Sequence, residues 1–460
     1  MFDLTINLDN ESKLPLYEQL YRAIAEQIQN GHLLAGEKLP SKRFLCEQFG
    51  ISHSTVETAY GFLVAEGYVQ AEPRIGYRVC EVVPLQSINE RKDVKEDNSP
   101  AKKEHSYLRF STGDVDTEIF PYASWAKIYK EVIYQEPELL QKGDPQGDLS
   151  FRETLRAFLE EYRGVHCKPE QIIVGAGVEY LLDLVLQLFP EEEKIALEDP
   201  GYDTAYRVAK NNGKTAIPVP VDAHGMELEP LYESKAHLAY VTPSHQFPMG
   251  FTMPMSRRTH LLQWANEQNG YIIEDDYDSE FRYRLRPIPA MQGLDREGRV
   301  IYIGTFSRTL APSIRAAYMV LPETLLPLWQ EHFGWQASTI SRFEQHALER
   351  FIRQGLYARH LRRLGPVYKG RMIMLKEALK GLQDAYISGE EAGMHFLLHL
   401  PQMEEASLIK EAADQGLMLT PLSQYCHEVS YEGTVLVLGF AGLTQETCKT
   451  AVQILKNICH

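Results

Sequence analysis

The sequence has few cysteines, no long apolar run and no excess of positive charge. Its six cysteines are scattered and form no CxxC pair, which argues against a disulfide framework and against a structural zinc site. No stretch approaches the roughly 18 apolar residues of a membrane-spanning helix. The opening residues, MFDLTINLDN, carry acidic groups instead of the apolar run of a signal peptide. We therefore expect a cytoplasmic protein with no metal site and no membrane partner.

Acidic residues outnumber basic residues by 63 to 47, and the net charge is -16. A generally basic surface for nucleic acid is thereby excluded, and any contact with DNA must come from a local patch. The length of 460 residues, of which 44% are hydrophobic, predicts a globular protein of two or three domains.

Residues 81–106 differ from the rest of the chain. They hold 11 charged residues, two prolines and no aromatic residue, a composition that buries too little apolar surface to offset the entropy of ordering. A long solvated helix is the alternative, which Pro84 and Pro100 disfavour. We predict an N-terminal domain at 1–80, a flexible linker at 81–106 and a C-terminal domain at 107–460.

The first half of the N-terminal domain predicts two helices. Apolar residues at helical spacing, from Leu16 to Ile28, mark an amphipathic first helix. Ser41 can cap a second helix over 42–49, which ends at Gly50.

A third helix and a hairpin follow. Ser52 or Ser54 can cap the helix, and Ser54 with Glu57 fits a capping box. Residues 68–80 then predict two short strands around a turn near 73–76. Short helices joined by a tight turn and followed by a hairpin are the α+β plan of a winged helix-turn-helix. A small helical protein-interaction domain is the alternative.

In a winged helix-turn-helix, the third helix enters the major groove through its N-terminal residues. Here those residues are small or polar hydrogen-bonding types, while basic residues begin the second helix and lie on the wing. The candidate DNA-binding residues are Lys42, Arg43, Ser52, His53, Ser54, Thr55, Thr58, Arg74, Tyr77 and Arg78. Positive charge therefore gathers where a duplex would lie, although the domain is acidic overall.

The segment GEKLPSKRFLCEQFGISHSTVETAYGFLVAEGYV resembles the GntR-type DNA-binding domain over nearly its whole length. Its LPSKRFL, GIS and TVETAYGFLVAEGY elements are together quite specific. One departure is His53, where the family often has arginine. The resemblance implies binding to a double-stranded DNA operator.

The C-terminal domain alternates short apolar strands with helical stretches over 172–320, the α/β signature of a mostly parallel sheet. The predicted strands are QIIVGAG, KIALEDP, AHLAYVTP, GYIIEDD, RVIYIGT and AAYMVLP. Ligands bind beyond the carboxyl ends of such strands. Glycines, hydroxyls, arginines, tyrosines and carboxylates follow these strands, and together they describe a pocket for a phosphorylated heteroaromatic ligand.

The same segments resemble the class I aminotransferases of fold type I, which use pyridoxal 5'-phosphate. The resemblance runs from about residue 108 to the end and includes IIVGAGVEYLLDLVLQLF, EDPGYDTA, VTPSHQFPMG, IIEDDYDSEFRY and GTFSRTLAPSIRAAY. Joined to a GntR-type domain by a polar linker, it is similar to the MocR family of transcription regulators.

The resemblance implies a role for each residue of the expected cofactor site. Asp275 would face the pyridine nitrogen and keep it protonated. Tyr277 would hydrogen-bond the ring 3′ oxygen, and Tyr202 would stack on the ring. The phosphate would be held by Gly177, Val178, Thr305, Ser307 and Arg315.

Two residues depart from the family's pattern. Arg308 stands at the position of the lysine that joins the cofactor covalently, and no lysine occurs between Lys235 and Lys369. A guanidinium is always protonated and cannot replace that amine, so we predict no catalytic residue there. Arg308 could instead pair with Asp275 or reach the ligand. Val437 stands where the family usually carries the arginine that binds an amino-acid carboxylate.

We therefore expect a DNA-binding transcription regulator whose aminotransferase-like domain senses a small-molecule effector. The effector would be non-covalently held pyridoxal 5'-phosphate or a related anion. The family's sites lie at a dimer interface, so the resemblance implies a homodimer that reads two half-sites. One alternative is an aminotransferase-type enzyme tethered to DNA, which Arg308 and Val437 oppose. The other is a regulator whose C-terminal domain serves only for dimerisation.

Overall fold

The computed structural model describes residues 8–9, 12, 14–81, 107–283 and 288–459. They form two compact units, one within residues 1–103 and one within residues 104–460. Residues 82–106, nearly all of the predicted linker, lie outside the described residues. In the described ranges, no helix is both long and apolar enough to cross a membrane.

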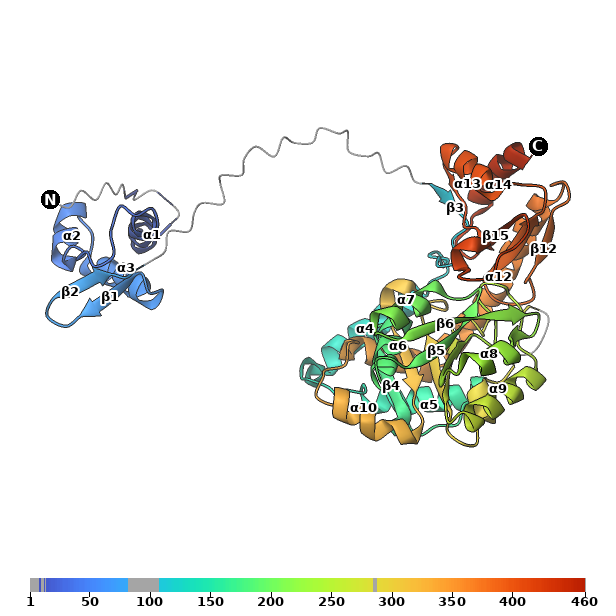
Figure 1. The fold of residues 1–460 in the computed structure, drawn as a ribbon. Helices are drawn as coiled ribbons and strands as arrows, with labels where there is room; N and C mark the ends of the chain where they lie inside the picture. The colour runs from blue at the N-terminus through green and yellow to red at the C-terminus, as the bar shows by residue number, and fades with distance from the viewer. Residues whose placement is uncertain (1–7, 10–11, 13, 82–106, 284–287, 460) are drawn as a thin grey trace. The chain divides into compact units, whose positions relative to one another are not determined.

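The N-terminal unit has three helices and a hairpin (Figure 1). They are α1 (Leu16–Gln29), α2 (Lys42–Phe49), α3 (His53–Ala65), β1 (Val69–Glu72) and β2 (Gly76–Val79). The two strands pair antiparallel, and apolar side chains of all five elements meet in one core. At its centre Tyr60 is fully buried and its hydroxyl donates to the Pro40 carbonyl at 2.8 Å. The winged helix-turn-helix predicted from the sequence is confirmed.

The hydrogen bonds at the N-terminus of α3 show which serine caps this helix. The Ser52 hydroxyl accepts a hydrogen bond from the Thr55 amide at 3.1 Å, which satisfies one of the free N–H groups of the first turn. The capping box of Ser54 with Glu57 is therefore wrong. The Glu57 carboxylate lies instead 2.7 Å from the Lys42 ammonium and ties α3 to the start of α2.

The C-terminal unit is built on an eight-stranded sheet of order β4-β11-β10-β9-β8-β5-β6-β7, in which β11 and β7 run antiparallel to the other strands. The strands are β4 (Ile172–Gly175), β5 (Lys194–Asp199), β6 (Thr215–Asp222), β7 (Gly225–Met226), β8 (Leu238–Val241), β9 (Tyr271–Asp276), β10 (Val300–Thr305) and β11 (Ala317–Val320). The predicted mostly parallel sheet is confirmed. Strand β6 was not predicted, because Pro218 and Pro220 interrupt the pattern of a strand.

Helices cover both faces of this sheet, because successive residues of a strand point to opposite sides. Ile272 packs with α8 and α9, whereas its neighbour Ile273 packs with α6 and α7. The helices on the first face are α4 (Tyr122–Gln135), α5 (Leu149–Arg163), α8 (Leu228–Ser234), α9 (Met255–Glu267) and α11 (Arg342–Arg353). Those on the second face are α6 (Val178–Gln187), α7 (Asp203–Asn211) and α10 (Leu326–Phe333).

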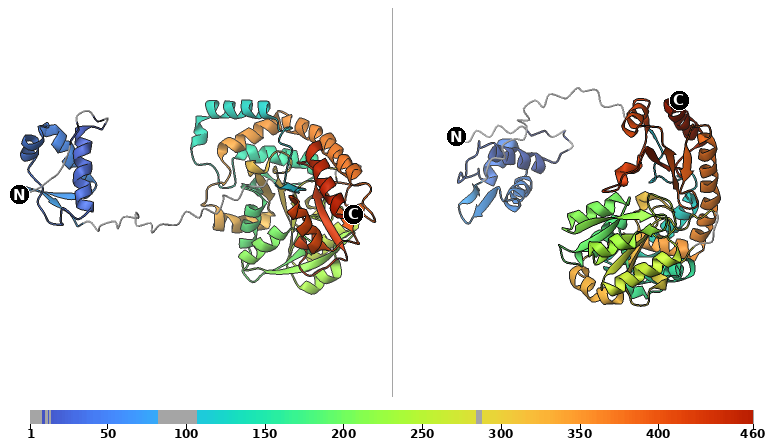
Figure 2. Two further views of the ribbon diagram at one scale, coloured as in Figure 1. Left: turned by 90° about the horizontal axis from the view of Figure 1, so that it is seen from above. Right: turned by 45° about the vertical axis from the view of Figure 1, so that its right-hand side comes forward.

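A smaller layer completes the unit. It contains the antiparallel strands β12 (Tyr386–Ser388), β13 (His395–Leu400) and β15 (Thr434–Gly439), the helices α13 (Glu405–Asp414) and α14 (Gln445–Cys459), and the paired strands β3 (Leu108–Arg109) and β14 (Leu417–Met418). The long helix α12 (Leu356–Leu379) joins the two layers (Figure 2). Its Tyr357 lies in the core of the large sheet, and its buried residues from Leu364 onward lie in the core of the small one.

Candidate ligand pocket and DNA-binding surface

A pocket opens beyond the carboxyl ends of the parallel strands, where the sequence predicted a ligand site. Eight of the nine predicted cofactor residues line it, namely Val178, Tyr202, Asp275, Tyr277, Thr305, Ser307, Arg308 and Arg315. The other lining residues are Gly113, Glu179, Thr242, Phe247 and Pro312. The ninth predicted residue, Gly177, lies directly behind Arg315.

Asp275, in β9, lines this pocket and has one carboxylate oxygen without a partner. Its Oδ2 accepts a hydrogen bond from the Tyr240 hydroxyl, while its buried Oδ1 has no partner among the described residues. Burial, together with the charges of Asp276 and Asp278, raises the pKa of Asp275 to about 7. A protonated ring nitrogen would supply both the missing hydrogen bond and a compensating charge, so this carboxylate fits the pyridine side of pyridoxal 5'-phosphate.

The opposite end of the pocket is built for an anion. Gly177 precedes the first turn of α6 with a φ of 104°, and a Cβ there would lie 2.3 Å from the Arg315 guanidinium. Only glycine therefore lets the backbone approach Arg315 so closely. The Thr305 hydroxyl donates to the Ser307 hydroxyl at 3.0 Å on the neighbouring turn. Backbone N–H groups, hydroxyls and a guanidinium are the donors that a phosphate requires.

One acidic residue at the anion-binding end of the pocket was not predicted from the sequence. The Glu179 carboxylate accepts hydrogen bonds from Arg315 at 3.0 Å and from the Tyr202 hydroxyl at 3.3 Å. Burial alone would raise the pKa of Glu179, but hydrogen bonds from its own backbone N–H and from Arg315 hold this pKa below its ordinary value. An anionic ligand must therefore compete with Glu179 for Arg315. An acid in the first turn of a helix is common, which is why the sequence did not single it out.

Arg308 lines the pocket and donates a hydrogen bond to the carbonyl of Thr112. The pairing of Arg308 with Asp275, one of the two possibilities left open by the sequence, is absent from the described ion pairs. The guanidinium is instead held by the segment that enters the C-terminal unit after β3. Its position beside Gly113 leaves it facing the ligand space.

Val437 lies away from the pocket lining. It is fully buried in β15 and packs with Leu397, Leu422 and Val435 in a small apolar cluster. A charge at this position would be buried without a partner, at considerable cost. The structure therefore offers no cation for an amino-acid carboxylate at residue 437.

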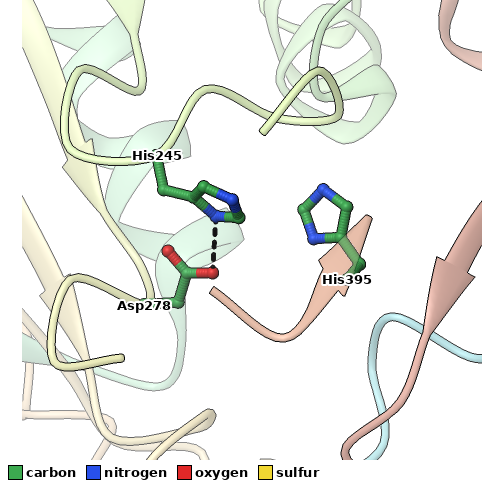
Figure 3. Close-up of side chains that lie close together, drawn as sticks. All are labelled: His245, Asp278 and His395. Atoms are coloured by element: carbon green, nitrogen blue, oxygen red, sulfur yellow. Dashed lines mark hydrogen bonds and ion pairs between the residues drawn. The ribbon is translucent and has the colours of Figure 1, made fainter. Parts of the chain in front are cut away.

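Behind the pocket wall, His245, Asp278 and His395 form a buried cluster (Figure 3). The Nδ1 atom of His245 lies 2.9 Å from Asp278 Oδ2, and the His395 Nε2 atom lies 3.0 Å from the Pro248 carbonyl. Burial and the neighbouring His245 hold the pKa of His395 well below its ordinary value.

These residue types could ligate a divalent cation, but the backbone leaves little room for one. A Cβ at Gly393 would lie 2.2 Å from His245 Nδ1 and 2.5 Å from Asp278 Oδ2. The Gly393 backbone thus covers the edge where the two side chains meet. The other nitrogen of His245 lies on the side of His395 (Figure 3), which would leave a cation there with too few protein ligands. We therefore interpret this cluster as a hydrogen-bonded group.

The predicted DNA-binding residues divide into two groups in the N-terminal unit. The exposed residues are Arg43, Ser52, His53, Ser54, Thr58 and Arg74. The half-buried residues are Lys42, Thr55, Tyr77 and Arg78. The exposed residues lie in the N-terminal halves of α2 and α3, including the N-cap of α3, and at the tip of the hairpin. They present hydroxyls and arginines that a duplex can reach.

The half-buried group makes contacts within the unit. Besides its pairing with Glu57, the Lys42 ammonium lies 5.6 Å from the centre of the Tyr77 ring, which packs edge-on against Tyr60 at 4.7 Å. Arg78 pairs with Glu72 across the hairpin at 3.2 Å. The Tyr77 contacts join the wing to α2 and α3, whereas the Arg78–Glu72 pair lies within the wing. The exposed arginines among the predicted residues are Arg43 and Arg74.

The fold and the pocket define a protein made of a winged helix-turn-helix and an aminotransferase-like unit. The family model "Bacterial regulatory proteins, gntR family" matches residues 16–79, and the model "Aminotransferase class I and II" matches residues 105–455. The chain belongs to the MocR-type subfamily of GntR transcription regulators, which joins these two domains.

Curated relatives match over nearly their whole length. The uncharacterized HTH-type transcriptional regulator YhdI of Bacillus subtilis is 39% identical over 99% of this chain and 98% of its own. The probable rhizopine catabolism regulatory protein MocR of Rhizobium meliloti is 33% identical over 98% and 95%. The pyridoxine biosynthesis regulator PdxR of Corynebacterium glutamicum is 29% identical over 97% and 96%. The chain is thus a DNA-binding transcription regulator with an aminotransferase-like sensing domain.

Solved structures match the C-terminal unit. A kynurenine aminotransferase from Pyrococcus horikoshii superposes with a TM-score of 0.69 and 25% identity, over 77% of this chain and 91% of that one. The α-aminoadipate aminotransferase LysN from Thermus thermophilus, complexed with N-(5'-phosphopyridoxyl)-L-leucine, gives a TM-score of 0.68 and 27% identity, over 77% and 92%. These matches confirm the predicted aminotransferase fold.

Asp275→Asn should stabilise the ligand-free protein at alkaline pH. In the folded protein the pKa of Asp275 is about 7, above its ordinary value of 3.8. Ionisation of Asp275 therefore lowers the free energy of unfolding, and this loss grows as the pH rises from the ordinary pKa to the folded-state pKa. We expect the variant to raise the thermal midpoint of the C-terminal unit by more at about pH 8 than at about pH 5.5. The exposed Asp384→Asn is the matched control, and an equal shift of Asp275→Asn at both pH values would contradict the assignment.

Proposed function

We propose that the C-terminal unit of this regulator binds pyridoxal 5'-phosphate, or a closely related phosphorylated heteroaromatic, without a covalent bond. Asp275 carries the proposal, because among the described carboxylates with a buried unpartnered oxygen it is the one that lines the pocket, and such an oxygen calls for an N–H donor. The donors around Arg315 suit the phosphate. Arg308, in the position of the family's lysine, offers no amine for covalent attachment.

The proposed response is a change in how two DNA-binding units engage an operator. A ligand that favours one arrangement of the protein shifts the population toward it, and a homodimer would present its DNA-binding units to two half-sites. A second copy is supported by exposed apolar side chains on and beside α4, among them Ile133, Tyr134 and Leu140, since exposed apolar patches mark interaction surfaces. Acting on the chromosome, the protein would work in the cytoplasm.

The first test is the intact mass of the protein after incubation with pyridoxal 5'-phosphate and reduction with borohydride. We expect the wild type to gain no cofactor mass and the Arg308→Lys variant to gain one, while the ligand raises the thermal midpoint of both, since specific binding stabilises the folded state. Labelling of one lysine in the wild type would revive the enzyme alternative. A lack of thermal response in both proteins would show that the pocket takes a different ligand.

Glu179→Gln should raise the affinity for pyridoxal 5'-phosphate. The substitution removes a negative charge from the anion end and frees Arg315 from a competing carboxylate. Repulsion of about 1 kcal/mol between charges near 4 Å, the value in bulk water, corresponds to roughly 5-fold in Kd. Calorimetric titration of the full chain measures the change, with the exposed Glu192→Gln as control. Unchanged or weaker binding would show that the phosphate does not bind at this end of the pocket.

Arg43→Ala should weaken DNA binding uniformly across sequences. Arg43 is exposed, and its Glu47 partner at 2.9 Å is also exposed, so this weak pair can give way to a contact between the guanidinium and a phosphate. Loss of one phosphate contact lowers the slope of log K against log salt by about 1. Binding to one duplex selected by the full chain, measured over a salt series, checks this slope, and Arg156→Ala on α5 is the control. An unaltered slope would place Arg43 outside the interface.

A further inference from the structure

Tyr277, His245 and Asp278 are joined through one ring nitrogen behind the pocket wall. The Tyr277 hydroxyl lies 3.0 Å from His245 Nδ1, and the same nitrogen lies 2.9 Å from Asp278 Oδ2. His245 and Asp278 are almost completely buried, whereas Tyr277 lines the pocket. The protonation of a single nitrogen therefore decides which way the Tyr277 hydroxyl can act.

The proton on that nitrogen follows from its partners. An ionised carboxylate only accepts hydrogen bonds, so the nitrogen that contacts Asp278 carries the hydrogen. A ring nitrogen that carries hydrogen has no lone pair left and cannot accept one from Tyr277. The tyrosine oxygen thus sits beside an N–H group, and its own hydrogen must point elsewhere.

Tyr277 keeps its proton. Burial and the charge of Asp278 hold the pKa of Tyr277 well above its ordinary value. Among the described residues its hydroxyl has no hydrogen-bond partner besides His245, and the space in front of the side chain is the pocket. The hydroxyl hydrogen is therefore available to a ligand.

The His245–Asp278 pair is also held rigidly. A Cβ at Gly393 would lie 2.0 Å from His245 Cε1, so the backbone at Gly393 packs directly against the ring. On its other side the ring of His395 lies 4.9 Å away, centre to centre. The imidazole is thereby kept in the orientation that presents Nδ1 to Tyr277 and Asp278.

We propose that Asp278, acting through His245, fixes Tyr277 as a hydrogen-bond donor to the pocket, so that the pocket selects ligands with an acceptor oxygen there. For a phosphorylated heteroaromatic, the favoured group is an ionised phenolic oxygen on the ring. The proposal rests on the function proposed above. It makes His245 and Asp278 positioning residues that touch no ligand, while the contact of Tyr277 with the ring oxygen is the one that the family resemblance implies.

The test compares pyridoxal 5'-phosphate with its 3-deoxy analogue, which lacks the ring oxygen, by calorimetric titration of the full chain. A hydrogen bond to a charged group gives the wild type a preference of about 10-fold or more for pyridoxal 5'-phosphate. Tyr277→Phe abolishes this preference, and Asp278→Asn and His245→Leu reduce it. His245→Asn restores it in part, because an amide N–H can stand near the position of Nδ1.

The control is His399→Asn. His399 is a half-buried histidine on β13 whose Nε2 lies 2.8 Å from the Ser388 hydroxyl. This variant should keep the wild-type preference. Equal preferences in the wild type, Asp278→Asn and His245→Leu would overturn the proposal, even where overall affinity or stability had fallen.

A second measurement needs no ligand. In the full chain labelled with 15N-histidine, the His245 Nδ1 proton should give a downfield resonance that survives Tyr277→Phe, is lost in His245→Asn and shifts in Asp278→Asn. An unprotonated Nδ1 in the wild type would overturn the proposal. If the wild type bound neither pyridoxal 5'-phosphate nor its analogue, the proposed function would fail, while this resonance would still decide whether Tyr277 faces the pocket as a donor.

Discussion

The ion pair between Arg163 and Asp276 is the contact on which the architecture of the C-terminal unit depends. Parallel strands end at one edge of the sheet, so their terminal carboxylates gather there, and burying a carboxylate is costly unless it is paired. Arg163 reaches from the end of α5 to Asp276 at 2.6 Å, to the Ser244 hydroxyl at 3.0 Å and to the Ile288 carbonyl at 2.8 Å. Burial alone would raise the pKa of Asp276, but Arg163 and Tyr302 hold this pKa below its ordinary value. One arginine thus compensates one of the buried carboxylates at this edge and joins a helix, a strand and two loops.

The compensation at this edge is uneven, and the unevenness marks the pocket. Asp275 and Asp276 each have one oxygen without a partner, but the other oxygen of Asp276 pairs with an arginine, whereas that of Asp275 accepts only from the Tyr240 hydroxyl. Other buried acids of this region, Glu198 and Asp278 among them, also have an oxygen without a partner, but Asp275 is the one of them that lines the pocket. The guanidinium of Arg308 cannot form an imine and Val437 is apolar, and both agree with the ligand-binding role proposed above. A regulator needs only to bind its ligand, provided that binding differs between two states of the protein.

The limits of sequence reasoning appear at particular residues. Periodicity and turn residues were sufficient for the helices of the N-terminal unit, because an amphipathic stripe and a cap are local features. The choice between Ser52 and Ser54 was not local, since Glu57 is drawn away by Lys42 from another helix. Likewise, Tyr77 and Arg78 carry the residue types of a DNA-contacting wing, yet both make contacts within the unit. Glu179 and His245 were overlooked as parts of the site, since their roles arise from partners distant in the chain.

The sequence by itself determined the two kinds of fold, the strand ends that would carry the pocket, and the arginine at position 308, where the resemblance predicts a lysine. These follow from residue type and order along the chain, which short-range patterns and motifs preserve. Only the tertiary structure decided which charged groups pair with one another and which remain available to a ligand. Arg315 meets Glu179, Arg308 meets the Thr112 carbonyl, and Asp278 governs Tyr277 through His245. The physical reason is that electrostatic and hydrogen-bonding partners are set by distance in space and by burial, neither of which sequence separation encodes.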